Sequence, residues 1–142
     1  MLIKEQIHAA AREVGFSLCG VAKCRSLDVS RTRFEGWLAS GCGDGLDYLS
    51  HNIDKRFDPA QLVEGAKTVI ICALNYRNAI TNGYSAEARC RVASYACTTD
   101  YHRTIKAMLR EVFARLRQSN PTLTGRAFVD SAPLAEKAWA VE

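Results

Sequence analysis

The sequence predicts an α/β fold, in which helices alternate with three or four strands in one domain over residues 1–142. Apolar residues recur at three- and four-residue steps near the start of the chain and again between residues 100 and 119, which indicates amphipathic helices. Residues 68–74 form a continuous β-branched and apolar run, which is typical of a strand covered on both faces. With 48% hydrophobic residues, a chain of 142 residues can bury a core. We therefore expect a sandwich of strands and flanking helices.

The first helix is expected to end at Gly15, because glycine readily adopts the left-handed conformation of a helix C-terminus. The apolar residues of this helix share one face: Ile3, Ile7, Ala10, Ala11 and Val14. Residues 16–22 are short and apolar and predict a strand. A second helix should follow, capped by Ser26 or Asp28 and closed by Gly41, with an apolar face formed by Phe34, Trp37 and Leu38.

Three glycines within residues 41–45 exclude regular structure there and favour turns. Such a segment is either a binding edge that a ligand can approach closely or a simple linker to a short helix over residues 46–51. Residues 68–74 then predict the central strand. Residues 75–89 predict a polar loop, and residues 91–96 predict another short strand.

The longest helix is predicted over residues 100–119, where one apolar stripe runs along the helix: Ile105, Met108, Leu109, Val112, Phe113 and Leu116. After it, residues 126–129 predict a short buried strand, and Pro133 should start a helix because proline suits the first helical turn. Asp130 would then lie beside the positive end of that helix. One interpretation is that Asp130 or Ser131 caps the helix. The other is that Asp130 is a general acid, which needs a carboxyl held away from water.

Nineteen Lys and Arg against fifteen Asp and Glu leave a formal charge of +4, which permits contact with nucleic acid without requiring it. The sequence has no apolar signal core and no apolar stretch near the roughly 20 residues of a membrane span, so we expect a cytosolic protein without membrane contact. The six cysteines form no Cys-x-x-Cys pair, and most are expected to be buried, reduced thiols. His8 and His51 are expected at the surface with no partner at ligand spacing, so no metal site is predicted.

Several blocks, in order along the chain, resemble the epoxyqueuosine reductases. One block is Val129–Lys137, which resembles the family stretch Val-Asp-Ser/Thr-Ala/Gly-Pro-x-x-Glu-Lys/Arg. The other blocks are Gly15–Ala22, Trp37–Gly41, Lys55–Pro59, Gly65–Ile70 and Asp100–His102. The resemblance spans essentially the whole chain. It implies a nitroreductase-like α+β fold, with a mixed sheet flanked by helices.

The resemblance also implies an oxidoreductase of queuosine biosynthesis. Members of the family reduce epoxyqueuosine to queuosine at the wobble position of transfer RNA, using cobalamin and two four-iron four-sulfur clusters. The implied partner is a tRNA anticodon loop, and we expect a monomer. The closely spaced cysteines that such clusters need are missing here, so no cluster is expected within this chain. We expect residues 1–142 to be the single amino-terminal cobalamin-binding domain of a longer enzyme, inactive without its cluster domain.

In the resembled family, the aspartate that matches Asp130 is taken as the proton donor. The residues that the resemblance places near cobalamin are Arg56, Tyr95, Asp100, His102, Ser131 and Ala132. Local alternatives are an ion pair of Arg56 with Asp54 or Asp58, and a helix cap at Thr98, Thr99 or Asp100. In that alternative, His102 simply satisfies a neighbouring group. Thr98 stands where the family usually has glycine. Residues 43–46 lack the family's histidine, small residue and methionine, so contacts from that loop are not inferred.

Two other kinds of protein are compatible with these patterns. One is a non-catalytic corrinoid-binding or trafficking module, which would have the same fold but no cluster domain. The other is a flavin-using relative of the nitroreductases. A Rossmann dinucleotide site and a phosphate-binding loop are not predicted, because the sequence has neither Gly-x-Gly-x-x-Gly nor Gly-Lys-Ser/Thr.

Overall fold

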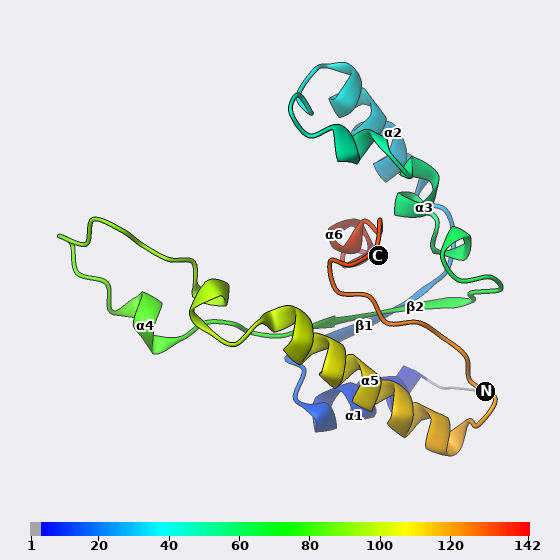
Figure 1. Ribbon diagram of the computed structural model, residues 1–142. Coiled ribbons are helices and arrows are strands. Elements are labelled where there is room, and N and C mark those ends of the chain that lie inside the picture. The colour runs from blue at the N-terminus through cyan, green and yellow to red at the C-terminus, as the bar shows by residue number, and fades with distance from the viewer. Residues whose placement is uncertain (1–3) are drawn as a thin grey trace. The chain divides into compact units, whose positions relative to one another are not determined.

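The structure is a computed structural model that describes residues 4–142, except for the side chains of residues 80 and 81. The chain forms two compact units. One unit holds the described part of Met1–Cys19 together with Cys72–Leu123, and the other holds Gly20–Ile71 and Thr124–Glu142. The strands β1 (Leu18–Lys23) and β2 (Thr68–Ala73) pair with each other, and each contributes residues to both units (Figure 1).

The two strands form an antiparallel ribbon. At one end, the N–H of Ser17 donates a hydrogen bond of 2.9 Å to the carbonyl of Ala73. At the other end, the N–H of Cys24 donates one of 3.0 Å to the carbonyl of Lys67. Because the residue number rises on one strand as it falls on the other, the pairing is antiparallel. The strands predicted over residues 16–22 and 68–74 are confirmed, with ends shifted by one or two residues.

In the first unit, α1 (Lys4–Val14) and α5 (Tyr101–Ser119) lie side by side (Figure 1). Both helices were predicted and are confirmed, and Ile3 of the first stripe lies outside the described residues. Gly15 ends α1 with φ +104°, a conformation that glycine adopts without the usual penalty. The unit buries one set of apolar side chains: Ile7, Ala10, Ala11, Phe16, Val112 and Leu116. Full burial of a large aliphatic side chain contributes about 1.5–3 kcal/mol, so this set holds the two helices together.

The strand predicted over residues 91–96 is wrong. The short helix α4 (Ala79–Asn82) lies inside the predicted polar loop, and the 3₁₀ helix η3 (Ser94–Cys97) covers part of the predicted strand. The N–H of Val92 donates to the hydroxyl of Tyr84 at 3.1 Å rather than to the carbonyl of a neighbouring strand. A strand needs a partner ladder, which the local sequence pattern does not reveal.

The helices of the second unit are α2 (Asp28–Ala39), η1 (Asp47–Ser50), α3 (Ile53–Phe57), η2 (Pro59–Gln61) and α6 (Glu136–Trp139). The predicted second helix is confirmed, but its predicted cap is wrong. The N-cap position is Leu27, without a capping side chain, and the Ser26 hydroxyl donates instead to the Asp28 carboxylate at 2.6 Å. Gly41 follows the helix at φ +78°, and its N–H donates to the carbonyl of Leu38.

The glycine-rich segment after α2 consists of consecutive turns. At Gly43 an added Cβ would come within 2.8 Å of the Leu38 side chain and within 3.3 Å of the Trp37 ring. Glycine at this position therefore permits close packing of the chain on the end of α2. This geometry supports the interpretation of residues 41–45 as a tightly packed linker, and the short helix expected after it is η1.

The core of the second unit is formed by Leu27, Phe57, Val69 and Trp139. The segment before α6 packs on this core through Leu134 and Ala135, which are partly buried. The strand predicted over residues 126–129 is wrong, because this stretch is irregular and only Val129 is buried. Within residues 4–142 the sheet thus has two strands rather than the expected three or four. None of the described helices combines the length and apolar character needed to cross a bilayer.

Candidate functional site

The segment that carries the predicted acid is an irregular connection held at both ends. Val129 is 6% exposed and Trp139 is 2% exposed, so both anchor the segment in buried surroundings. Between them, Asp130 is exposed and has φ +47°. Residues other than glycine rarely adopt a positive φ, although aspartate and asparagine do so more often than others. The anchored ends thus present Asp130 on a sharp turn that faces solvent.

The expectation that Pro133 starts a helix is wrong. Helix α6 begins at Glu136, and its N-cap position is Ala135, without a capping side chain. Neither Asp130 nor Ser131 caps this helix, and Asp130 lies six residues before its first residue. A positive potential beside Asp130 was expected because a helix was predicted to start there. Since the helix starts six residues later, that expectation no longer has support. Asp130 is also exposed rather than held away from water.

Glu136 is a residue of this segment that the sequence reasoning did not identify as functional. Its carboxylate Oε1 accepts a hydrogen bond of 3.1 Å from the backbone N–H of Asp130. Half-burial raises the pKa of the Glu136 carboxyl, the Asp130 N–H partly offsets that rise, and the charge of the Asp130 carboxylate adds to it. The signal that could have found it is the glutamate of the Val129–Lys137 block itself.

Arg56 lies beside this segment in the same unit. The backbone carbonyl of Arg56 accepts a hydrogen bond of 2.9 Å from the N–H of Ala135. Its guanidinium carbon is 5.4 Å from the centre of the Phe34 ring, a distance suited to a cation–π contact. The Arg56 Nε is buried and has no hydrogen-bond partner among the described residues. Buried donors are rarely left unpaired in native proteins, so this atom is a candidate contact for a ligand.

The alternative partners considered for Arg56 are engaged elsewhere. Asp54 pairs with Arg31 at 2.8 Å, and the Asp58 carboxylate accepts a hydrogen bond of 3.0 Å from the N–H of Ala60. Asp58 thereby caps η2, in which Pro59 occupies the first turn. The turn-like segment after Arg56 is thus fixed by its own cap rather than by the arginine.

In the other unit, the predicted residues Tyr95, Asp100 and His102 surround the start of α5. Asp100 is the N-cap, and its Oδ1 lies 2.9 Å from both the backbone nitrogen and the ring Nδ1 of His102. Both hydrogen bonds lower the pKa of the Asp100 carboxyl, and the bond to the His102 side chain has the larger effect. Of the three candidate caps, Thr98, Thr99 and Asp100, the structure has Asp100, which also orients the imidazole of His102.

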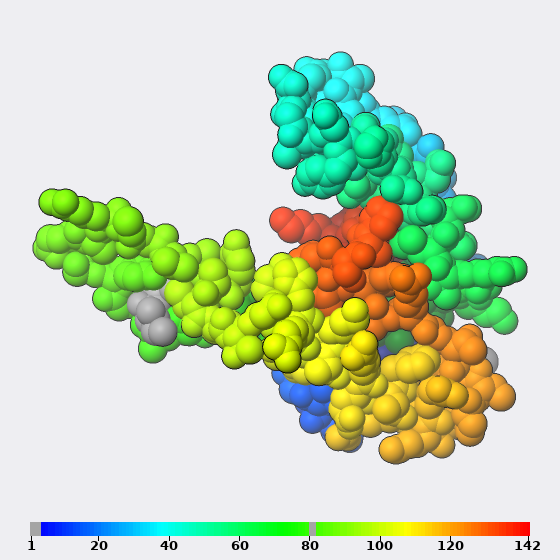
Figure 2. Space-filling view, in the orientation of Figure 1, coloured from blue at the N-terminus to red at the C-terminus, as the bar shows by residue number. Residues whose placement is uncertain are grey.

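Aromatic rings follow one another from this helix start. The rings of Tyr101 and His102 stack with centroids 4.1 Å apart, and Tyr95 meets Tyr101 edge to face at 5.9 Å. Tyr76 in turn meets Tyr95 at 6.3 Å, and both of these tyrosines are more than half exposed. Figure 2 shows the stretch before η3 extending away from α5, in light green against yellow. The unit therefore carries an accessible aromatic surface.

Thr98 fits this surface without strain. Its φ of −127° and ψ of 178° are extended values that any residue adopts. The Thr98 hydroxyl donates to the carbonyl of Tyr95 at 3.2 Å. The departure from the family's usual glycine therefore needs no change in the backbone at this position.

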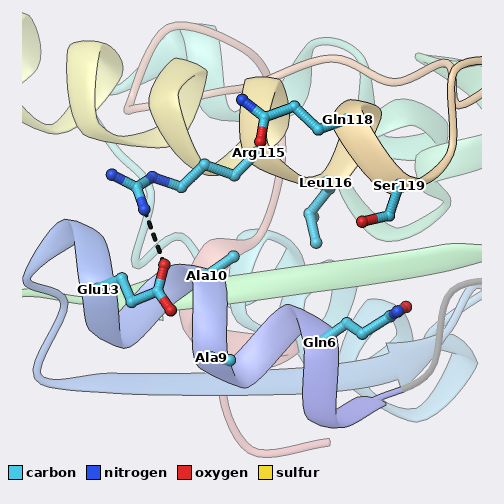
Figure 3. Close-up of a pocket in the computed structure, with 8 residues that line it drawn as sticks. All are labelled: Gln6, Ala9, Ala10, Glu13, Arg115, Leu116, Gln118 and Ser119. Atoms are coloured by element: carbon cyan, nitrogen blue, oxygen red, sulfur yellow. Dashed lines mark hydrogen bonds and ion pairs between the residues drawn. The ribbon is translucent and has the colours of Figure 1, made fainter.

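A groove on the first unit lies apart from both groups of predicted residues. It has a volume of about 240 Å³ and lies between α1 and α5 (Figure 3). Arg115 crosses its edge and pairs with Glu13 at 2.7 Å and with Glu111 at 2.9 Å. Because these ion pairs satisfy the arginine, Arg115 is not free to bind an anionic ligand in the groove.

Neither the cysteines nor the histidines form a metal centre among the described residues, where no group of three or more metal-ligating side chains occurs. All six cysteines are free, but the expectation that most are buried is wrong. Cys42 and Cys90 are exposed and the other four are half-buried. Of the two histidines expected at the surface, His51 is exposed, whereas His8 is half-buried with its Nε2 enclosed.

Comparison with known proteins extends these observations. Residues 56–131 match the family described as epoxyqueuosine reductase QueG, DUF1730, which is more than half of the chain. The chain belongs to this family. The matched QueG region begins at Arg56 and ends at Ser131, so it includes Asp130.

A curated relative is the epoxyqueuosine reductase of Cellulophaga algicola, which is 37% identical over 136 residues. That match covers 96% of this chain and 44% of the relative, so this QueG family member spans less than half of the relative's length.

Solved structures support the fold. An epoxyqueuosine reductase from Streptococcus thermophilus matches with a TM-score of 0.78 at 23% identity, over 94% of this chain and 36% of that one. An epoxyqueuosine reductase crystallised with an epoxyqueuosine-modified tRNA-Tyr stem loop matches with a TM-score of 0.74 at 22% identity, over 96% and 36% of the two chains. The mixed α/β arrangement of this chain is therefore a QueG-like fold.

Proposed function

We propose that this chain is the cobalamin-binding domain of an epoxyqueuosine reductase, which reduces epoxyqueuosine to queuosine at the wobble position of transfer RNA. Membership of the QueG family and the curated relatives named for this activity support the proposal. The observation that carries it furthest is the placement of Asp130 on an exposed, left-handed turn. The Arg56 segment is hydrogen-bonded to the same stretch of chain.

The first proposed cofactor contacts are Arg56, Ser131 and Ala132. Cobalamin carries amide side chains around its corrin ring, whose carbonyl oxygens accept hydrogen bonds. The enclosed Arg56 Nε is a donor without a partner among the described residues, so its chemistry fits such an acceptor. When bound, cobalamin supplies the cobalt-centred reduction, and the protein supplies binding and orientation.

The second proposed group is Tyr95, Asp100 and His102 of the other unit. The Tyr95 ring offers an exposed apolar face, and the Asp100 carboxylate can accept from an amide N–H. The hydrogen bond from the ring Nδ1 of His102 to the Asp100 carboxylate holds the imidazole in one orientation. We propose that these three side chains contact the cofactor from a preorganised surface.

We propose that Asp130 donates the proton that the departing epoxide oxygen requires. Exposure of its carboxyl lets a substrate approach. Substrate binding would then remove water from the carboxyl, and loss of water favours the protonated form of a carboxylic acid. A positioned general acid typically contributes about 10² to 10⁴-fold to the rate.

The proposed reaction also needs a source of electrons and a transfer RNA substrate. The reduction consumes electrons, and we propose that two four-iron four-sulfur clusters outside this chain deliver them, as the resemblance implies. The proposed partner is the anticodon loop of transfer RNA, by analogy with the relative crystallised with a tRNA stem loop. We propose a monomer that acts in the cytoplasm.

A binding titration tests this proposal. The chain is titrated with cobalamin and, separately, with flavin mononucleotide, and the visible spectrum of each ligand is followed. We expect a saturable change with cobalamin and none with the flavin. A saturable change with the flavin alone would contradict the proposal and favour a flavin-using relative.

Substitutions test whether Arg56 takes part in this binding. Arg56→Ala should weaken cobalamin binding about 10- to 100-fold, because hydrogen bonds to charged groups contribute about 1.5–3 kcal/mol. Arg33→Ala is the matched control, since Arg33 is an exposed arginine of α2 in the same unit. Equal affinities of these two variants would show that Arg56 makes no cofactor contact.

A further inference from the structure

We propose that Glu136 is a positioning residue that holds Asp130 in its left-handed conformation. The inference rests on the proposed function for the role of Asp130, but the conformational effect can be measured without it. The contact is the hydrogen bond of 3.1 Å from the Asp130 backbone N–H to the Glu136 carboxylate. Glu136 acts through the backbone N–H of Asp130, not through its carboxyl.

The conformation of Asp130 needs such support. Its φ of +47° lies in a region that side chains other than glycine occupy only when the surroundings enforce it. On one side, buried Val129 fixes the chain that enters the turn. On the other, the hydrogen bond to Glu136 fixes the Asp130 N–H. Both restraints act on the backbone from which the Asp130 side chain leaves.

Glu136 is well placed to act as a fixed acceptor. It is the first residue of α6, and the same short helix ends at Trp139, which is 2% exposed and belongs to the core. The N–H of Ala135, directly before Glu136, is bonded to the carbonyl of Arg56. The backbone of Glu136 is thus anchored from both sides, and its half-buried side chain reaches back six residues rather than capping its own helix.

The electrostatics match this role. A charged carboxylate that accepts a backbone N–H forms a stronger hydrogen bond than a neutral acceptor does. The Asp130 N–H supports the ionised form of Glu136, against the effect of burial and of the Asp130 carboxylate. That carboxylate is the charged group that acts on Glu136 most directly.

Nuclear magnetic resonance tests the conformational effect on the chain itself. In the parent protein, we expect the amide proton of Asp130 to shift with pH as Glu136 titrates. In Glu136→Ala, the chemical shifts of Asp130 and the three-bond coupling between its amide and α protons should move toward the values typical of a negative φ. Glu136→Gln keeps an oxygen acceptor and should preserve the parent conformation. Glu64→Ala, at an exposed glutamate of the same unit, is the matched control.

A rate measurement tests the link to Asp130. Single turnover of an epoxyqueuosine-containing stem loop is followed with cobalamin and a strong chemical reductant, at equal cofactor occupancy. Because misplacement of a catalytic group by about 1 Å can cost about 10²-fold, Glu136→Ala should lose about that factor. In the Asp130→Asn background the same substitution should cost little, since the group that it positions is already gone.

The possible outcomes separate the two ideas. If the Asp130 resonances of Glu136→Ala match the parent, or its rate falls equally in both backgrounds, Glu136 does not position Asp130. If the parent neither binds cobalamin nor reacts, the proposed function fails, and the resonance data still decide the role of Glu136. If Glu136→Ala does not fold, the comparison of the parent with Glu136→Gln decides. The proposal is then overturned by either of two results. One is an Asp130 amide resonance in the parent that does not shift as Glu136 titrates. The other is a set of Asp130 resonances in Glu136→Gln that indicates a negative φ.

Discussion

The backbone carbonyl of Arg56 accepts a hydrogen bond of 2.9 Å from the backbone N–H of Ala135. These residues are far apart in the sequence, and they belong to two of the blocks that resemble the epoxyqueuosine reductases. The bond is a main-chain contact, so it does not depend on which side chains occupy the two positions. It joins α3, the helix that carries Arg56, to the segment that follows Asp130 in the same unit.

Trp139 should be the most sensitive position in the core that supports this contact. Trp139→Ala is expected to reduce the free energy of unfolding by about 3–5 kcal/mol, because it removes a large side chain that is 2% exposed. Trp139→Phe should cost less, since the Trp139 Nε1 is buried without a partner among the described residues. Urea unfolding measures both. Trp37→Ala is the control, because Trp37 is 38% exposed, and an equal loss there would contradict the assigned core.

The cap at Asp100 should stabilise α5 in a pH-dependent way. Because its pKa is lowered in the folded protein, the ionised carboxyl contributes stability above its unfolded pKa, and this contribution is lost as the pH falls through the folded pKa. At pH 7 the melting temperature should be highest for the parent, lower for Asp100→Asn and lowest for Asp100→Ala. The gap between the parent and Asp100→Asn should close at acidic pH. A gap that does not depend on pH would show that the carboxylate charge contributes nothing.

The thiols should differ strongly in reactivity. Cys19 and Cys72 face each other across the two strands with their sulfur atoms 3.9 Å apart. Burial, together with the neighbouring Cys19, raises the pKa of Cys72 to about 12, so its reactive thiolate is scarce near neutral pH. Mass spectrometry after brief alkylation should find Cys42 and Cys90 modified first, because both are exposed. Early modification of Cys72 would contradict the structure.

The sequence predicted the elements whose stability depends on a repeating apolar pattern. The α1 and α5 stripes bury Ile7 and Val112 as the helical period requires, and the apolar run around Val69 forms β2. The prediction was wrong for residues 91–96 and 126–129, which are short stretches that mix apolar residues with arginine. Whether such a run becomes a strand depends on a partner with free hydrogen-bonding edges, and that partner is a property of the tertiary structure.

The resemblance supplied the candidate site residues, but it did not predict their local geometry. Pro133 suggested a helix start because proline suits the first helical turn. In the structure Leu134 and Ala135 pack on the core instead, and the helix begins at Glu136. The same packing leaves Asp130 on a left-handed turn instead of at a cap. A hydrogen bond over six residues, such as that from Asp130 to Glu136, has no periodic signature in a sequence.

The most direct test of the central claim is a comparison of the parent with Asp130→Asn. Asparagine keeps the shape of the side chain and tolerates a positive φ, but it cannot supply the acidic proton. Single turnover of an epoxyqueuosine-containing stem loop is measured at equal cobalamin occupancy with a strong chemical reductant, alongside the melting temperature of each protein. The account predicts a rate lower by about 10² to 10⁴-fold with an almost unchanged melting temperature. A variant that reacts at the parent rate, or that fails only because it unfolds, would show that Asp130 has a structural role and is not the acid.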